Sequence, residues 1–266
     1  MEILLKAVTV TYTRTFTFIP TTERFADWED APDQESVGFC AFEDLFSIIH
    51  DEIAGPKNPM PYTTTKEFEK MNINAERVSG IRPKSGAVGC TMSHIRCIEL
   101  AKKRNYEYVF VCEDDITFTN PELLQQNLQK FYDNKDLNWD VLIIGGNSVP
   151  PYQKLDEGGD YAVRVFNCQT TTGYIVKQEM YDTFISNFKE GVKKLVDTSN
   201  GKLYSLDIYW KKMQMQYYWY MITPATVTQY ENYSDIEQRQ TNYNHLMLDM
   251  EKKWLIKQQQ KQMTFT

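Results

Sequence analysis

The sequence predicts an α/β fold in which helices pack on a mainly parallel central sheet. Short and wholly apolar runs, such as Tyr108–Cys112 and Val141–Ile144, are typical of strands that are buried on both faces. These runs alternate with segments of helical periodicity, such as residues 93–104 and 121–131. Strands that alternate with helices are typical of α/β sandwiches, so we expect this class.

The first elements are expected in the following order. Residues 7–19 alternate threonine with apolar side chains, which predicts a strand with one wet face, and residues 39–53 have the pattern of a short amphipathic helix. A short strand is expected at 75–78. A glycine turn is expected at Gly86–Cys90, followed by a helix that Ser93 caps at its N-terminus.

The remaining elements follow from the same patterns. The strand at 108–112 is expected to end in acidic residues, and Pro121 suits the first position of the next helix. The apolar run 141–144 is expected to end in a turn at Gly145-Gly146. Further short elements are expected as strands at 161–166 and 174–176 and as a helix at 179–188.

Composition excludes several classes of protein. The chain has 266 residues, with 29 Lys and Arg against 36 Asp and Glu, which gives a net charge of −7 and argues against a nucleic-acid-binding protein. No apolar run reaches the roughly 18 residues of a membrane span. The first residues do not resemble a signal peptide, and none of the five cysteines forms a C-x-x-C pair, so we expect reduced thiols and a cytoplasmic protein.

The strongest chemical signal is Glu113-Asp114-Asp115, which directly follows the strand at 108–112. Three consecutive carboxylates at the end of a buried strand are electrostatically costly unless a cation lies beside them. Ligands of α/β sheets bind beyond the carboxyl ends of the strands, and carboxylate oxygens suit Mg²⁺ or Mn²⁺. The pattern therefore indicates a divalent metal that holds a diphosphate; a solvated acidic turn is the alternative.

The order of several motifs resembles glycosyltransferase family 25, which includes bacterial lipooligosaccharide (lipopolysaccharide-type) and collagen galactosyltransferases and has members in large DNA viruses. The G-x-x-G-C-x-x-S-H pattern of that family matches Gly86–His94, and its apolar strand ending in E-D-D matches Val109–Asp115. Weaker matches follow in the same order along the chain, over Asn74–Val78, Trp139–Ile143, Thr170–Val176, Leu206–Trp210, Pro224–Gln229 and Ser234–Ile236.

The resemblance implies a GT-A-type nucleotide-binding sandwich and transfer of a hexose, galactose or glucose, from a UDP-sugar, with inversion. The acceptor would be a hydroxyl of a glycan or a glycoprotein, including the hydroxylysine type. Mn²⁺ or Mg²⁺ is the implied cofactor. Asp115 is the first candidate for the metal ligand and Glu113 the second, while Asp114 is expected to contact the donor ribose or to hold the turn.

The resemblance also suggests the residues that act on the donor and the acceptor. Asp207 is the candidate for the base that takes the proton of the acceptor hydroxyl, with Asp235 as its rival; a helix cap is the alternative role for Asp207. Tyr209 and Trp210 are expected to stack on the acceptor sugar. Residues expected to bind the donor are Arg77, His94, Gly89 and Ser93. His94 could instead brace the metal-binding turn from beneath. The structural alternatives are a salt bridge for Arg77, a core histidine that joins two loops for His94, a close approach to the sheet for Gly89 and a helix cap for Ser93.

A single glycosyltransferase domain is thus expected over residues 1–266. Within it, 61–180 would bind the nucleotide sugar and metal, 181–250 would face the acceptor, and 251–266 would form a tail. Residues 1–60 depart from the family, which usually opens with a strand followed by an Arg-rich turn. That departure favours a second hypothesis, a degenerate member that serves as a binding or adhesion module. A third is another metal-dependent phosphate enzyme on a similar sheet.

Overall fold

The computed structural model describes residues 7–11, 62–73, 75–81, 83–155, 159–234 and 239–254. All of them belong to one compact unit, which comprises Met1–Tyr12 and Asn58–Thr266. The strand expected at 7–19 is described only at 7–11. The helix expected at 39–53 and the candidate base Asp235 lie outside the described residues.

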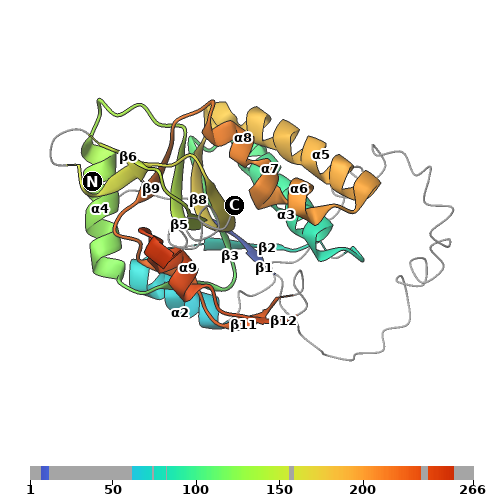
Figure 1. The fold of residues 1–266 in the computed structure, drawn as a ribbon, viewed down its shortest axis with the longest axis horizontal. Helices are drawn as coiled ribbons and strands as arrows, with labels where there is room; N and C mark the ends of the chain where they lie inside the picture. The colour runs from blue at the N-terminus through green and yellow to red at the C-terminus, as the bar shows by residue number, and fades with distance from the viewer. Residues whose placement is uncertain are drawn as a thin grey trace, which may run out of the picture. The chain divides into compact units, whose positions relative to one another are not determined.

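A central sheet of eight strands has the order β2-β1-β3-β8-β5-β9-β7-β6 (Figure 1). The buried run that the sequence predicts at 108–112 becomes β3, and it lies next to the middle of the sheet with four consecutive buried residues. The strands are β1 (Ala7–Thr11), β2 (Ala75–Ser79), β3 (Tyr108–Glu113), β5 (Val141–Ser148), β6 (Gln153–Lys154), β7 (Ala162–Arg164), β8 (Cys168–Lys177) and β9 (Trp219–Ile222).

The sheet is mixed, so the predicted mainly parallel sheet is wrong. Strand β1 pairs in parallel with β2 and β3, and β5 pairs in parallel with β9. The other four pairings, β3–β8, β5–β8, β7–β9 and β6–β7, are antiparallel. The physical reason is that apolar runs report burial on both faces of a strand and carry no information about its direction.

Four long helices cover the two faces of this sheet, with α3 and α5 on one face and α2 and α4 on the other (Figure 1). Alternate strand residues face opposite sides. Phe110 of β3 therefore packs in one core with Phe68 and Phe131, whereas Tyr174 of β8 stacks on Phe184. The helices are α2 (Tyr62–Met71), α3 (Gly86–Lys103), α4 (Pro121–Asp133) and α5 (Tyr181–Thr198).

A short strand pair follows the carboxyl end of β3. Strand β4 (Ile116–Phe118) follows the acidic residues and pairs in antiparallel fashion with β10 (Val227–Gln229), which sets Gln229 opposite Ile116. The remaining short elements are the 3-10 helix η4 (Gln178–Met180), helices α6 (Gly201–Tyr204), α7 (Leu206–Tyr209), α8 (Lys211–Gln214) and α9 (Asn244–Leu248), and the strand pair β11 (Asn232–Ser234) and β12 (Arg239–Thr241).

Several predicted elements are confirmed with changed bounds. Helix α3 begins at Gly86, so the expected turn at Gly86–Cys90 is helical and Ser93 lies inside the helix rather than at its cap. Strand β5 continues through Gly145-Gly146, where register shifts interrupt its pairing with β8. Backbone hydrogen bonds thus override the local turn signal of glycine at both places.

No helix among the described residues has both the length and the apolar character that crossing a bilayer requires.

Gly89 is the position in α3 where a side chain is least tolerable. A Cβ atom added there would lie 2.7 Å from Pro83 Cδ and would collide with the Ile81 carbonyl oxygen. We expect Gly89→Ala to lower the free energy of unfolding by about 1–3 kcal/mol, because backbone must move to accommodate the methyl group. Urea denaturation measures this change. Gly201→Ala, whose Cβ would meet only the flexible Ser205 side chain at 3.2 Å, is the control, and an equal effect of the two substitutions would contradict the prediction.

Candidate active site at the carboxyl end of β3

The pairing of β3 with β8 defines the site. Because these strands are antiparallel, Cys112 near the end of β3 lies opposite Gly173 in the middle of β8, and the residues that precede Gly173 extend past the end of β3. The polar segment Thr170-Thr171-Thr172 therefore adjoins the acidic segment Glu113-Asp114-Asp115. The site thus combines carboxylates from one strand end with hydroxyl and amide donors from the neighbouring strand.

Glu113 is held by one hydrogen bond to each of its carboxylate oxygens. The Thr171 hydroxyl donates to Oε1 over 2.7 Å, and the Gln229 amide donates to Oε2 over 2.5 Å. Thr171 belongs to β8 and Gln229 to β10, so segments distant in sequence fix this side chain. Hydrogen bonds to an ionised carboxylate are among the stronger ones in proteins, which makes the position of Glu113 well defined.

Asp115 combines burial with repulsion from its neighbours, and hydrogen bonds from Gln229 and from its own backbone offset these effects in part. Its Oδ1 atom is buried and accepts no hydrogen bond from the residues that the structure describes. Burial raises the pKa of Asp115 well above its ordinary value, and the negative charges of Glu113 and Asp114 raise it further. A divalent cation at this oxygen would relieve both the desolvation and the repulsion.

The backbone of the acidic turn is tied to two other segments. The Thr64 hydroxyl donates to the Asp114 carbonyl oxygen over 2.6 Å, and the Tyr230 N–H donates to the Asp115 carbonyl oxygen over 2.9 Å. These bonds come from α2 and from the residue after β10. The turn is therefore fixed by hydrogen bonds to its main chain.

Asp207 lies at the same site, at the start of α7. Its Oδ2 accepts a hydrogen bond from the Thr170 N–H over 3.0 Å. Burial raises its pKa, and the charge of Glu113 adds to that shift, whereas the bond to Thr170 and the charge of Lys211 oppose it. Thr170 has a φ of 71°, a left-handed conformation that is strained for a β-branched residue. Strain of this kind concentrates at functional sites, and here it aims an N–H at Asp207.

His94 lies beneath the cluster rather than in the open site. It is fully buried on α3, and its Nδ1 is 2.8 Å from the Tyr174 hydroxyl. Its Nε2 is 3.9 Å from Glu113 Oε1. This placement favours the brace over direct contact with the donor.

Among the other expected donor-binding residues, Ser93 and Gly89 are buried in α3. The Ser93 hydroxyl donates to the Gly89 carbonyl oxygen over 2.7 Å and accepts from the Ile81 N–H over 2.8 Å. The predicted contact of Ser93 with the donor is therefore wrong. Gly89 lies against Ile81, so its lack of a side chain serves helix packing. Arg77 lies opposite Thr9, which in turn lies opposite Cys112, so it is two strands away from β3.

The two aromatic residues expected to bind the acceptor differ in exposure. Trp210 is fully buried: its indole N–H donates to the Cys168 carbonyl oxygen over 2.9 Å, and its ring packs edge-on against Trp219. The predicted stacking of Trp210 on a sugar is wrong, because this side chain fills the core between α7 and the sheet. Tyr209 is half-buried and lies 4.0 Å from the Lys212 ammonium group.

The structure adds residues that the sequence did not single out. Thr171 and Gln229 hold Glu113, Thr64 holds the acidic turn, and Thr170 orients Asp207. Three of these four residues lie within the Thr170–Val176 and Pro224–Gln229 segments that resemble the family. The sequence pointed to these segments only because they occur in the same order as in the family. The role of each residue depends on which strands become neighbours, and this is not visible in the sequence.

Comparison with known proteins identifies the class. Residues 84–199 match the model of glycosyltransferase family 25, described as an LPS biosynthesis protein. This region contains α3, β3 with the acidic residues at its end, and all of β8 with its hydroxyl donors. The predicted resemblance to glycosyltransferase family 25 is confirmed over these residues, and the match supports glycosyl transfer in general. A search of the curated proteins finds no significant match.

Solved structures resemble the chain only distantly. A197 from STIV is 9% identical over 89% of this chain and 92% of its own, with a TM-score of 0.40. A mannose-1-phosphate geranyltransferase from Thermus thermophilus is 10% identical over 83% and 74%, with a TM-score of 0.36. A glycosyltransferase involved in the glycosylation of the major capsid of PBCV-1 is 10% identical over 82% and 94%, with a TM-score of 0.33. Sequence identities and TM-scores this low do not indicate which activity the chain has.

The raised pKa of Asp115 predicts a cost of stability in the metal-free protein. When folding raises the pKa of an acid, the folded state holds the proton more tightly than the unfolded state. Such an acid therefore destabilises the native state at any pH above its pKa in the unfolded chain, about 3.9 for aspartate. We therefore expect Asp115→Asn, in the presence of a chelator, to increase the free energy of unfolding at pH 7 by about 1 kcal/mol or more. The gain should shrink as the pH falls toward the ordinary value, where both states bind the proton.

Denaturant titrations at several pH values measure this difference. Asp136→Asn is the control, because Asp136 is an exposed acid in the segment before β5. Equal stability of the Asp115→Asn variant and the parent protein across the whole pH range would contradict the assigned environment.

Proposed function

We propose that the chain transfers a hexose from a UDP-sugar to an acceptor hydroxyl, with a divalent cation bound at Asp115. The observation that carries this proposal is the buried and uncompensated Oδ1 of Asp115 in a cluster of three carboxylates, within the segment that matches the family. Such a cluster gains most from a ligand that brings positive charge. A nucleoside diphosphate would complete the coordination of that cation from the solvent side.

The donor set fits Mn²⁺ or Mg²⁺, because all candidate ligand atoms here are carboxylate oxygens. Asp115 is the first candidate ligand. Glu113 is the second, although its two oxygens already accept hydrogen bonds from Thr171 and Gln229. Asp114 remains a candidate for the donor ribose. When bound, the cation would neutralise the charge that develops on the leaving diphosphate.

Asp207 is proposed as the general base that takes the proton of the acceptor hydroxyl. Its burial and the charge of Glu113 raise its pKa, which brings the carboxylate closer to the pH at which a base works best. The hydrogen bond from the strained Thr170 backbone fixes its orientation. Asp235 remains a rival that lies outside the described residues.

The acceptor is proposed to be a glycan or glycoprotein hydroxyl, consistent with the description of the matched family model as an LPS biosynthesis protein. The class alone leaves galactose and glucose as alternative donor sugars. A donor screen that measures UDP release, followed by mass spectrometry of the product, identifies both substrates. It also separates transfer from the two other hypotheses, a degenerate binding module and a phosphate-releasing enzyme.

Substitution of the proposed metal ligand tests the mechanism. We expect Asp115→Asn to lower metal-dependent transfer by at least about 100-fold, because it removes charge that holds the cation. Asp136→Asn should retain parental activity. The activity is measured as UDP release with each donor sugar in the presence of Mn²⁺. Parental activity in Asp115→Asn would contradict the assignment.

Substitution of the proposed base should affect turnover rather than donor binding. We expect Asp207→Asn to lower kcat by about 10²- to 10⁴-fold, the usual range for loss of a general base. The affinity for UDP with Mn²⁺ should change little, because Asp207 is assigned to the acceptor. Steady-state kinetics and calorimetric titration with UDP measure the two effects. An unchanged kcat would contradict the assignment of Asp207 as the general base. Asp235→Asn would then be the next variant to measure.

A further inference from the structure

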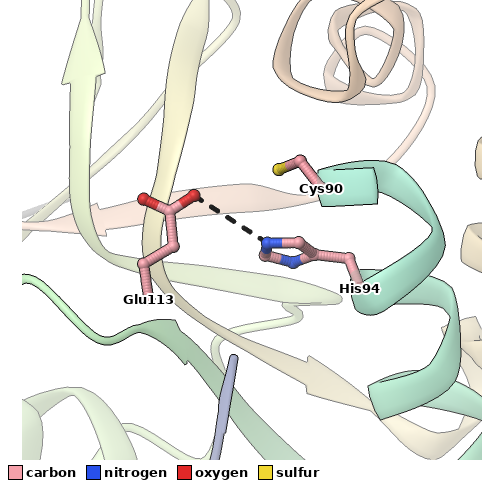
Figure 2. A group of neighbouring side chains, drawn as sticks. All are labelled: Cys90, His94 and Glu113. Atoms are coloured by element: carbon pink, nitrogen blue, oxygen red, sulfur yellow. Dashed lines mark ion pairs between the residues drawn. The ribbon is translucent and has the colours of Figure 1, made fainter. Parts of the chain in front are cut away.

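A second group of metal-ligand atoms lies directly behind the carboxylate cluster. The Cys90 thiol, His94 Nε2 and a Glu113 carboxylate oxygen all lie within 4.8 Å of one another (Figure 2). Cys90 and His94 are four positions apart in α3, which places them on the same face of the helix. Glu113 approaches them from the end of β3, so the group joins a helix to the central sheet.

The orientation of His94 is the independent observation that points to a ligand. Its ring stacks on Tyr174 at a centroid distance of 5.7 Å, and its Nδ1 is 2.8 Å from the Tyr174 hydroxyl. Nε2 therefore points toward Glu113, at 3.9 Å, which exceeds a hydrogen-bond distance. This nitrogen is buried and has no hydrogen-bond partner among the described residues.

This arrangement is typical of a histidine that binds a metal. A ligating histidine usually uses its other ring nitrogen in a hydrogen bond that fixes the tautomer and the ring orientation. The bond between Nδ1 and Tyr174 serves that purpose here. When Nδ1 carries the proton and donates it to the Tyr174 hydroxyl, Nε2 is the unprotonated nitrogen, and it faces Glu113 with Cys90 nearby (Figure 2).

The spacing of the three groups suits a tetrahedral ion. With zinc–ligand distances of about 2.0–2.3 Å, the ligand atoms of such an ion lie about 3.3–3.7 Å apart. The distance of 3.9 Å between His94 Nε2 and Glu113 Oε1 is close to that value. All three ligand atoms lie within 4.8 Å of one another, so small side-chain rotations would bring them to the spacing of a bound ion.

We propose that Cys90, His94 and Glu113 form a zinc-type site, which lies beside the oxygen site at Asp115 with Glu113 between the two and is additional to the proposed function. A thiolate, an imidazole and a carboxylate select Zn²⁺ over Mg²⁺ and Mn²⁺, because sulfur is a soft ligand. The thiolate and the carboxylate together balance the charge of the ion. Bound there, the ion ties α3 to the end of β3 and fixes the carboxylate on which the proposed active site depends.

Cobalt is a suitable probe, because Co²⁺ occupies zinc sites and gives a charge-transfer absorption band when a thiolate binds it. The whole chain is first stripped of metal with a chelator and then titrated with Co²⁺. We expect a thiolate-to-cobalt band that saturates at a single ion per chain and disappears when Zn²⁺ is added. Absence of this band in the folded parent protein would overturn the proposal, whatever the variants show.

Matched variants then locate the site. Cys90→Ser is expected to abolish the band and to weaken Zn²⁺ binding more than about 100-fold, and His94→Gln to weaken it at least about 10-fold. Cys97→Ser is the control, because Cys97 is a fully buried thiol on the same helix whose pKa burial raises to about 12. Circular dichroism establishes that each variant is folded. A band that persists in folded Cys90→Ser would overturn the proposal.

A further variant separates this site from the proposed transferase site. Asp115→Asn is expected to keep the cobalt band and to lose affinity for UDP with Mn²⁺ in calorimetric titration. Loss of the band in folded Asp115→Asn would instead show that cobalt binding at the thiolate depends on Asp115, and it would overturn a site distinct from the Asp115 site. Failure of the proposed transferase function appears in the UDP and Mn²⁺ measurements, whereas failure of the zinc-type site appears in the cobalt spectrum.

Discussion

The concentration of negative charge at the end of β3 is the constraint to which the surrounding structure responds. Three consecutive carboxylates follow a strand whose four residues before Glu113 are buried, and ionised groups in such a position require hydrogen bonds or opposite charge. A threonine hydroxyl and a glutamine amide satisfy Glu113, and two bonds from other segments fix the backbone of the turn. Asp115 is left with a buried oxygen that no described residue satisfies. This buried oxygen is where we propose that a divalent cation binds.

The antiparallel course of β8 makes this arrangement feasible. A parallel neighbour would bring its own carboxyl end to this edge, whereas β8 brings its first residues, which carry the hydroxyl donors. The same strand places Thr170, in its strained conformation, where its N–H meets Asp207. Tyr174 of β8 also reaches His94 on α3, so one strand connects the carboxylates, the candidate base and the helix behind them.

Much of this architecture could be predicted from the sequence, because the signals were local. The apolar run 108–112 predicted β3, and Pro121 predicted the start of α4. The acidic residues that follow β3 pointed to the candidate active site. The direction of β8 could not be predicted, because apolar periodicity is the same in both directions. Ser93 has the chemistry of a helix cap, yet α3 extends over the glycines before it because packing against Ile81 stabilises that turn. The burial of Trp210 is a tertiary property, since the same residue on an exposed face of α7 would have suited a sugar.

The central claim is that the acidic end of β3 binds a divalent cation together with a nucleoside diphosphate. Electron paramagnetic resonance of Mn²⁺ tests it directly, because the sharp spectrum of the free aquo ion is lost when the ion enters a low-symmetry protein site. The account predicts that the free-ion signal falls as protein is added in the presence of UDP, to a single bound ion per chain, and that Asp115→Asn restores it. A free-ion signal that is the same with and without the parent protein, at millimolar UDP, would contradict the account.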